Sequence, residues 1–151
     1  MICVIGLGYV GLPLANAFAK KYNVVGIDIN ENRIKDLNGF NDQTLELSSD
    51  ELKITIGSSL QIFSDINKAK NCKIYIVTVP TPVKDSKQPD LSPVINATKS
   101  VATILKKDDI IIFESTVYPG ATEEVCVPIL EKESGLVFNI DFFVGYSPER
   151  I

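Results

Sequence analysis

The first eleven residues constrain the fold more than any other stretch of the sequence. An apolar run, Met1 to Ile5, leads directly into Gly6, Gly8 and Gly11, which have the spacing G-x-G-x-x-G. Apolar side chains then recur at helical spacing, so the glycines are predicted to lie at the turn between a β-strand and an α-helix. This order is typical of a unit that binds a dinucleotide.

Each glycine has a separate reason to be there. Gly6 allows a tight turn, Gly8 leaves the backbone bare where a diphosphate approaches, and Gly11 lets the helix pack closely on the strand. The N–H groups of the first helical turn then face the phosphates. The predicted cofactor-binding loop consists of Gly6, Leu7, Gly8, Tyr9, Val10 and Gly11.

A carboxylate follows at the distance that a nucleotide ribose requires. Asp28 lies twenty residues after Gly8 and closes the second apolar run, 23–27. It is placed to accept both hydroxyls of an adenosine ribose, and it would repel a 2′-phosphate. The expected cofactor is therefore NAD and not NADP. Arg33, in the first turn of the next helix, either lies over the adenine or its ribose or is an ordinary solvated arginine.

Composition limits the other classes of function. The chain of 151 residues is the size of one domain, and its net charge is −4 with lysines scattered among acids, which disfavours nucleic-acid binding. It has no apolar run long enough to span a membrane, and its opening residues lack the basic region of a signal peptide. We expect a single domain with no membrane or nucleic-acid partner.

Cysteine and histidine usage narrows the chemistry. The three cysteines, Cys3, Cys72 and Cys126, are far apart in the sequence, which fits buried thiols in the cytoplasm better than disulfides or a zinc site. Cys126 is predicted to belong to the core. The chain has no histidine, so no metal site is expected and any proton transfer must use other groups.

Strand and helix patterns alternate along the rest of the chain. Strands are predicted at 1–5, 23–27, 60–63, 73–79, 109–113 and 142–145, with helices between them, one capped by Ser92 and one by Thr122. Residues 44–57 fit either a short helix or a strand, and a short helix is expected. The predicted fold is α/β: a three-layer, Rossmann-type, doubly wound parallel sheet of about six strands with helices on both faces.

Two loops should meet the glycine turn at the carboxyl edge of this sheet. The β-branched run 73–79 ends in Pro80-Thr81-Pro82, and the run 109–113 delivers residues 114–120 to the same edge. Ligands of doubly wound sheets collect there, so Pro80 and Thr81 are expected to border the cofactor. The alternative is that Pro80 merely ends the strand.

Four stretches together resemble the UDP-glucose/GDP-mannose dehydrogenase family. They are Gly6-Leu7-Gly8-Tyr9-Val10-Gly11-Leu12-Pro13, Val79-Pro80-Thr81-Pro82, Glu114-Ser115-Thr116-Val117-Tyr118-Pro119-Gly120 and Tyr146-Ser147-Pro148-Glu149-Arg150. Pro80 and Arg150 look more like the branch that oxidises UDP-N-acetylhexosamines than like the UDP-glucose enzymes. The resemblance implies that residues 1–151 are the NAD-binding domain only, without the central helical and C-terminal domains.

The resemblance also implies a reaction and two catalytic positions. The family oxidises the C6 alcohol of a UDP-sugar to a uronic acid with two NAD, through a cysteine that this chain lacks. Thr116 and Glu149 match the residues that hold and help activate water, with Glu149 as the base. Without the family, Thr116 reads as a helix-entry cap and Glu149 as an exposed loop carboxylate. Ser115 and Thr116 are also expected to contact the cofactor.

Three functions follow from these observations. The leading one is the NAD-binding domain of a UDP-sugar 6-dehydrogenase that is a homodimer at full length, whereas the domain alone is inactive and monomeric. The alternatives are a β-hydroxyacid dehydrogenase, whose substrate loop usually differs from residues 114–120, and a stand-alone, noncatalytic NAD sensor.

Overall fold

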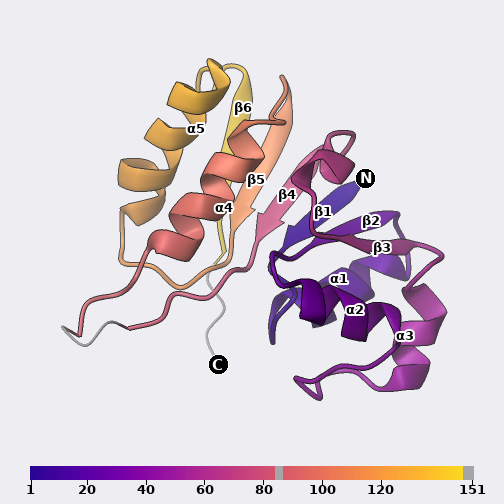
Figure 1. The fold of residues 1–151 in the computed structure, drawn as a ribbon. Helices are drawn as coiled ribbons and strands as arrows, with labels where there is room; N and C mark the ends of the chain where they lie inside the picture. The colour runs from indigo at the N-terminus through magenta and orange to yellow at the C-terminus, as the bar shows by residue number, and fades with distance from the viewer. Residues whose placement is uncertain (84–86, 148–151) are drawn as a thin grey trace.

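Six parallel strands form one sheet, which confirms the predicted doubly wound fold (Figure 1). The computed structural model describes residues 1–83 and 87–147. Across the sheet the order is β3-β2-β1-β4-β5-β6. The strands are β1 (Ile2–Ile5), β2 (Val24–Ile27), β3 (Leu60–Phe63), β4 (Ile74–Val77), β5 (Asp109–Phe113) and β6 (Phe142–Tyr146).

Helices cover both faces of the sheet. Figure 1 shows α1, α2 and α3 beside β1 to β3, and α4 and α5 beside β4 to β6. The helices are α1 (Gly11–Ala19), α2 (Glu31–Asn38), α3 (Ser49–Thr55), α4 (Ser92–Ala102) and α5 (Val127–Ser134), with a short 3-10 helix η1 (Ile66–Ala69) and a short π-helix η2 (Thr122–Cys126). Because the strand order reverses between β1 and β4, their carboxyl ends form a switch point where ligands bind in such sheets.

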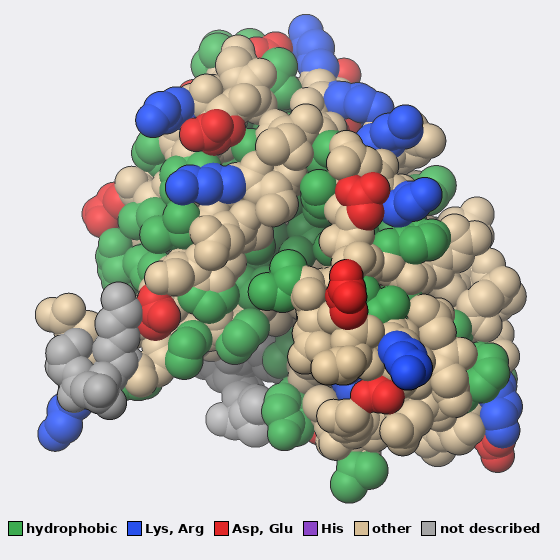
Figure 2. All heavy atoms as spheres, viewed as in Figure 1, with side chains coloured by type: hydrophobic (Ala, Val, Ile, Leu, Met, Phe, Trp, Pro, Cys, Tyr) green, Lys and Arg blue, Asp and Glu red, His purple; other side chains and the backbone are tan. Residues whose placement is uncertain are grey.

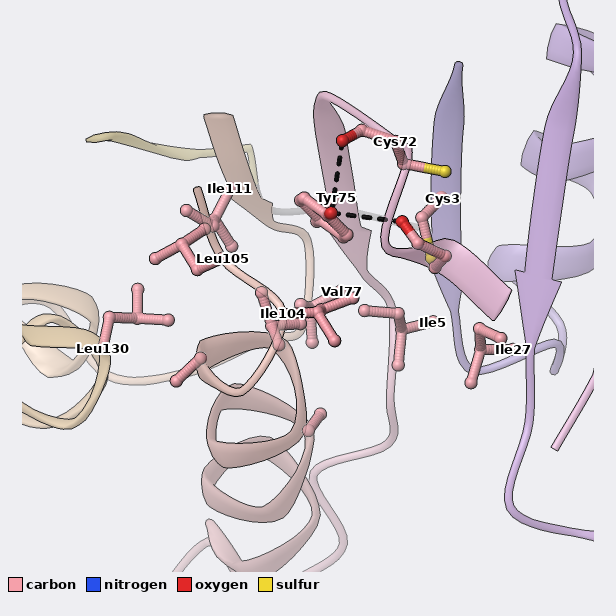
Figure 3. Packing of buried hydrophobic residues seen from close by; sticks show 14 of the residues in the cluster. Cys3, Ile5, Ile27, Cys72, Tyr75, Val77, Ile104, Leu105, Ile111 and Leu130 are labelled. Atoms are coloured by element: carbon pink, nitrogen blue, oxygen red, sulfur yellow. Dashed lines mark hydrogen bonds between the residues drawn. The ribbon is translucent and has the colours of Figure 1, made fainter. Parts of the chain in front are cut away.

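Side chains along each strand alternate between the two faces of the sheet, so the hydrophobic core consists of two clusters, one on each face. Cys3 and Ile5 of β1 face the layer of α4 and α5, whereas Ile2 and Val4 face the layer of α1. In the first cluster, Tyr75 is fully buried, and its hydroxyl lies 3.2 Å from the carbonyl oxygens of Ala69 and Cys72 (Figure 3). Strands β1 and β2 are therefore dry on both faces, as expected at the centre of a parallel sheet, whereas Ile110 of β5 and Phe143 of β6 are exposed on the face away from α4 and α5.

The three thiols lie inside this core. Cys3, Cys72 and Cys126 are free and buried, which confirms that Cys126 belongs to the core. Burial raises the pKa of the Cys126 thiol, and the pKa of the Cys3 thiol is also raised, first by its interaction with Cys72 and then by burial. Cys3 and Cys126, buried and with raised pKa values, are therefore poor nucleophiles.

Two predicted helix caps are wrong. Ser92 is the first residue of α4 and not its cap, since its N–H and hydroxyl both donate to Asp90, at 3.0 and 2.7 Å. Thr122 belongs to η2 and is buried. It is not a cap because the left-handed turn at Gly120 (φ +90°) makes the helical backbone begin earlier, at Ala121.

The ambiguous segment 44–57 contains a helix, as expected. In α3 the side chain of Ser48 accepts from the Glu51 N–H at 3.3 Å, and the Ser48 N–H donates to the Glu51 carboxylate at 2.9 Å. This reciprocal pair fixes the start of the helix. After the helix, Ile56 makes an isolated parallel bridge to Leu60, so this residue alone pairs as the alternative strand would.

The exposed surface carries charges of both signs, interspersed rather than gathered on the face that Figure 2 shows. None of the helices in residues 1–83 and 87–147 has the length and apolar character needed to cross a membrane.

Candidate functional site

A cavity of about 980 Å³ opens at the carboxyl edge of the sheet, at the switch point between β1 and β4. Figure 2 shows the molecule hollowed between the half that carries α4 and the half that carries α2. The cavity is lined by the glycine loop, the residues after β2, β3, β4 and β5, and the start of α4. The site therefore lies where the sequence predicts it.

The three glycines have the geometry that their predicted roles require. Gly6 turns the chain with φ +91°, which favours glycine. A Cβ on Gly11 would lie 1.8 Å from the carbonyl oxygen of Gly6, so any larger residue would push α1 away from β1. A Cβ on Gly8 would meet no atom within 4 Å. The protein itself does not need a glycine there, which leaves the space to a ligand.

Asp28 holds the glycine loop through a backbone contact. One of its carboxylate oxygens accepts from the Leu7 N–H at 2.8 Å and the other from the Asn30 N–H at 2.9 Å. A carboxylate offers about four lone pairs, so each oxygen can still accept a hydroxyl. Asp28 lines the cavity and fits a ribose diol.

Arg33 is not the solvated arginine that was one interpretation of the sequence. Its side chain is buried, and its Nε–H donates to the carbonyl oxygen of Leu7 at 2.9 Å. The guanidinium forms an ion pair with Asp42 at 2.7 Å and donates to the Thr44 hydroxyl at 3.3 Å. Both backbone groups of Leu7 are thus held by side chains of the next βα unit, and Arg33 still lines the cavity.

Asp42 anchors the loop that encloses Arg33. Burial by itself would raise the pKa of this carboxyl group, but the hydrogen bonds from Thr44, the close contact with Arg33 and the hydrogen bond from the backbone N–H of Leu47 outweigh burial and lower the pKa to about 2. Asp42 is therefore ionised throughout the neutral pH range. Its importance was missed in the sequence because it lies in a loop without regular periodicity.

The loops after β4 and β5 are joined by side-chain hydroxyl groups. Ser115 donates to the carbonyl oxygen of Val79 at 2.6 Å, and Thr81 donates to that of Thr116 at 2.7 Å. Pro80, Thr81, Ser115 and Thr116 all line the cavity. Glu149 and Arg150 lie outside the described residues.

Several residues of the site were not identified in the sequence. The Thr78 hydroxyl lies 2.7 Å from the carbonyl oxygen of Gly6 and supports the glycine loop from β4. Ser64 and Asp65 line the cavity after β3, and Asn96 and Ser100 line it from α4. The positions after β3 could have been found from the rule that parallel strands end at one edge. The residues of α4 could not, because they depend on the angle at which the helix packs.

Within the part of the chain that the structure describes, no group of three His, Cys, Asp or Glu residues is placed to hold a metal ion. What the cavity does offer is bare backbone at Gly8, a carboxylate with spare lone pairs at Asp28 and a helix start between them. These features fit the diphosphate and ribose of a dinucleotide.

Comparison with known proteins agrees with this geometry. Residues 1–151 match the model of the NAD binding domain of the UDP-glucose/GDP-mannose dehydrogenase family. The chain is 57% identical over 150 residues to the UDP-N-acetyl-D-glucosamine 6-dehydrogenase of Pseudomonas aeruginosa and 55% identical to that of Salmonella typhi. Each match covers 99% of this chain but only 35% of the relative.

Solved structures show the same fold. A UDP-D-ManNAc dehydrogenase from Pyrococcus horikoshii superimposes with a TM-score of 0.93 at 35% identity, covering 100% of this chain and 37% of that one. A GDP-mannose dehydrogenase from Pseudomonas aeruginosa gives 0.91 at 26% identity, covering 99% and 36%. The chain thus spans about a third of the length of these relatives. It belongs to the UDP-glucose/GDP-mannose dehydrogenase family, of which residues 1–151 match the NAD-binding domain.

Proposed function

We propose that this chain is the NAD-binding domain of an enzyme that oxidises the C6 alcohol of a UDP-N-acetylhexosamine to the carboxylate with two NAD. The observation that carries the proposal is the arrangement of Asp28 and Gly8 at one cavity, with lone pairs and open space left for a dinucleotide. The choice of sugar is supported by the relatives at 55–57% identity, which are UDP-N-acetyl-D-glucosamine 6-dehydrogenases.

When bound at this cavity, NAD would supply the hydride acceptor for the oxidation at C6 of the sugar. The residues of this chain would hold the cofactor: Gly8 would leave room for the diphosphate, and Asp28 would accept the hydroxyls of the adenosine ribose. Pro80, Thr81, Ser115 and Thr116 form the opposite wall of the cavity. Thr116 and Glu149 are proposed to orient a water molecule, with Glu149 accepting its proton.

The proposal places the reacting thiol outside these 151 residues. Cys3, Cys72 and Cys126 are buried in the core, away from the residues that line the cavity. The reaction would therefore depend on the further domains that the length of the relatives implies. The chain by itself should bind NAD without turning over substrate. Free buried thiols suit the cytoplasm, and the full-length enzyme is proposed to be a homodimer.

Turnover by the full-length gene product tests the activity. With UDP-N-acetylglucosamine and NAD, we expect two NADH for each sugar consumed and a slower reaction with UDP-glucose. Oxidation of small hydroxy acids instead would support the β-hydroxyacid dehydrogenase alternative. Tight NAD binding without turnover of any nucleotide sugar would support the noncatalytic sensor.

Calorimetry with NAD and NADP tests the binding half of the proposal. Asp28 should make NAD the tighter ligand, because a 2′-phosphate would meet a like charge. Equal affinity for the two cofactors, or no binding of either, would contradict the proposed role of this cavity.

A further inference from the structure

We propose that Asp42 is a specificity-determining residue that excludes NADP by neutralising Arg33. The inference rests on the proposed binding of NAD in this cavity and extends it to a residue that does not itself line the cavity. Asp28 excludes NADP by direct repulsion. Asp42 would act indirectly, by neutralising the positive charge of Arg33, which could otherwise bind a 2′-phosphate.

Arg33 lies where such a cation would be needed. In sheets of this type, an arginine near the acidic residue at the end of the second strand is what accommodates a 2′-phosphate. Arg33 lines the same cavity as Asp28, and the two side chains hold the carbonyl oxygen and the N–H of Leu7, respectively. An unpaired guanidinium at this position would favour NADP.

The guanidinium of Arg33 has N–H donors that none of the described residues uses. It carries five N–H donors, and it uses Nε on Leu7 and one Nη2 donor on Thr44. Its Nη1 atom is buried and, despite the ion pair, makes no hydrogen bond to the residues that the structure describes. Asp42 therefore neutralises the positive charge of Arg33 without using all of its N–H donors.

The charges at the ribose end of the cavity favour NAD. Asp28 and Asp42 contribute two negative charges and Arg33 one positive charge, so the three side chains together carry a net charge of −1. A 2′-phosphate adds up to two more negative charges. Removing Asp28 alone would leave the neutral pair of Arg33 and Asp42, which offers a 2′-phosphate no net positive charge.

Hydrogen bonds from the surrounding loop hold the Asp42 carboxylate in place beside Arg33. One carboxylate oxygen accepts from the Thr44 N–H at 3.0 Å and from its hydroxyl at 2.7 Å, and the other accepts from the N–H groups of Glu46 and Leu47 at 2.9 and 3.0 Å. The side chain is fully buried in its ion pair. Four hydrogen bonds on one carboxylate leave it no other orientation.

The test measures NAD and NADP affinity by calorimetry on the full-length protein. Asp28→Ser should weaken NAD binding but leave NADP the poorer ligand, because Arg33 remains neutralised. Adding Asp42→Asn should raise the affinity for NADP relative to NAD by about tenfold or more, the gain from one charge-assisted hydrogen bond. Adding Arg33→Gln to that pair should abolish the gain.

Thr44 supplies a second route that leaves Asp42 in place. In the Asp28→Ser background, Thr44→Lys should raise relative NADP affinity because it offsets the charge of Asp42, whereas Thr44→Val, its neutral match, should not. These two variants decide the question if Asp42→Asn fails to fold.

Two results would overturn the inference: NADP becoming the preferred ligand with Asp28→Ser alone, or unchanged selectivity with both Asp42→Asn and Thr44→Lys. If the wild-type protein binds neither cofactor, the proposed function fails instead.

Discussion

The two halves of the cavity are held in different ways. On the side of β1 and β2, charged side chains fix the glycine loop: Asp28 and Arg33 hold the two backbone groups of Leu7. On the side of β4 and β5, two loops hold each other through hydroxyl groups, from Ser115 to Val79 and from Thr81 to Thr116. The first half is a preformed cradle for a charged ligand, and the second is a wall joined by neutral bonds that are individually weaker.

The core beneath the second half gives the largest expected effect. Phe142→Ala should lower the free energy of unfolding by about 3–5 kcal/mol, because Phe142 is fully buried against α4 and α5. Its neighbour Phe143 points to the opposite face and is 43% exposed, so Phe143→Ala is the matched control and should cost much less. Denaturant unfolding measures both. Equal losses would contradict the assignment of the two faces.

Two glycines of the first half are expected to have different roles, Gly11 in stability and Gly8 in ligand binding. Gly11→Ala should destabilise the fold by about 3 kcal/mol, because its Cβ would collide with the backbone of Gly6. Gly8→Ala meets no protein atom and should leave stability within about 0.5 kcal/mol of wild type. The same variant should nevertheless weaken NAD binding about tenfold or more, since the methyl group fills the proposed diphosphate space. Thermal unfolding and calorimetry together separate the two roles.

Asp28, the carboxylate of the first half, should contribute directly to the affinity for NAD. Asp28→Ala is expected to weaken NAD binding by about 1.5–3 kcal/mol, the usual loss for a charge-assisted hydrogen bond. Asp50→Ala, which removes an exposed carboxylate of α3, is the control and should leave NAD affinity unchanged. Similar losses in both variants would mean that general charge, and not the position of Asp28, governs binding.

The ion pair of the first half predicts a dependence on pH. The pKa of Asp42 is lowered from 3.8 to about 2 by its hydrogen bonds. This shift contributes about 2 kcal/mol of stability that is present above pH 4 and is lost as the pH falls toward 2. Comparing wild type with Asp42→Asn in denaturant across this range measures the contribution. A difference in stability that stays constant down to pH 2 would contradict it.

The wall of the second half should show the smallest effect. Ser115→Ala removes one neutral hydrogen bond to Val79 and should cost about 1 kcal/mol of stability. Ser100→Ala is the control, because its hydroxyl bonds only within α4. If Ser115→Ala weakened NAD binding as much as Asp28→Ala, the contrast between the halves would be wrong.

Much of the fold could be predicted because its signals are local. Each strand is a short apolar run, and the spacing from Gly8 to Asp28 is set within one βαβ unit. The start of α2 is also set locally, since the side chain of Asn30 accepts from the N–H groups of Asn32 and Arg33. The caps at Ser92 and Thr122 failed because Asp90 and Gly120, outside each expected helix, set where the helical backbone begins.

The parts of the site that could not be predicted depend on contacts between distant residues. Arg33 was placed at the cavity, but the partner that buries it, Asp42, lies in an irregular loop. The bonds that join Ser115 to Val79 and Thr81 to Thr116 cross from one βα loop to the next. No spacing rule within a single unit describes such pairs, so they could not be predicted from the sequence.

A crystal structure of the full-length protein with NAD tests the central claim most directly. The account predicts that the diphosphate lies against the backbone at Gly8 and that the adenosine ribose donates its hydroxyls to Asp28, which keeps its bond to the Leu7 N–H. A cofactor bound elsewhere, or a ribose that does not reach Asp28, would contradict the account.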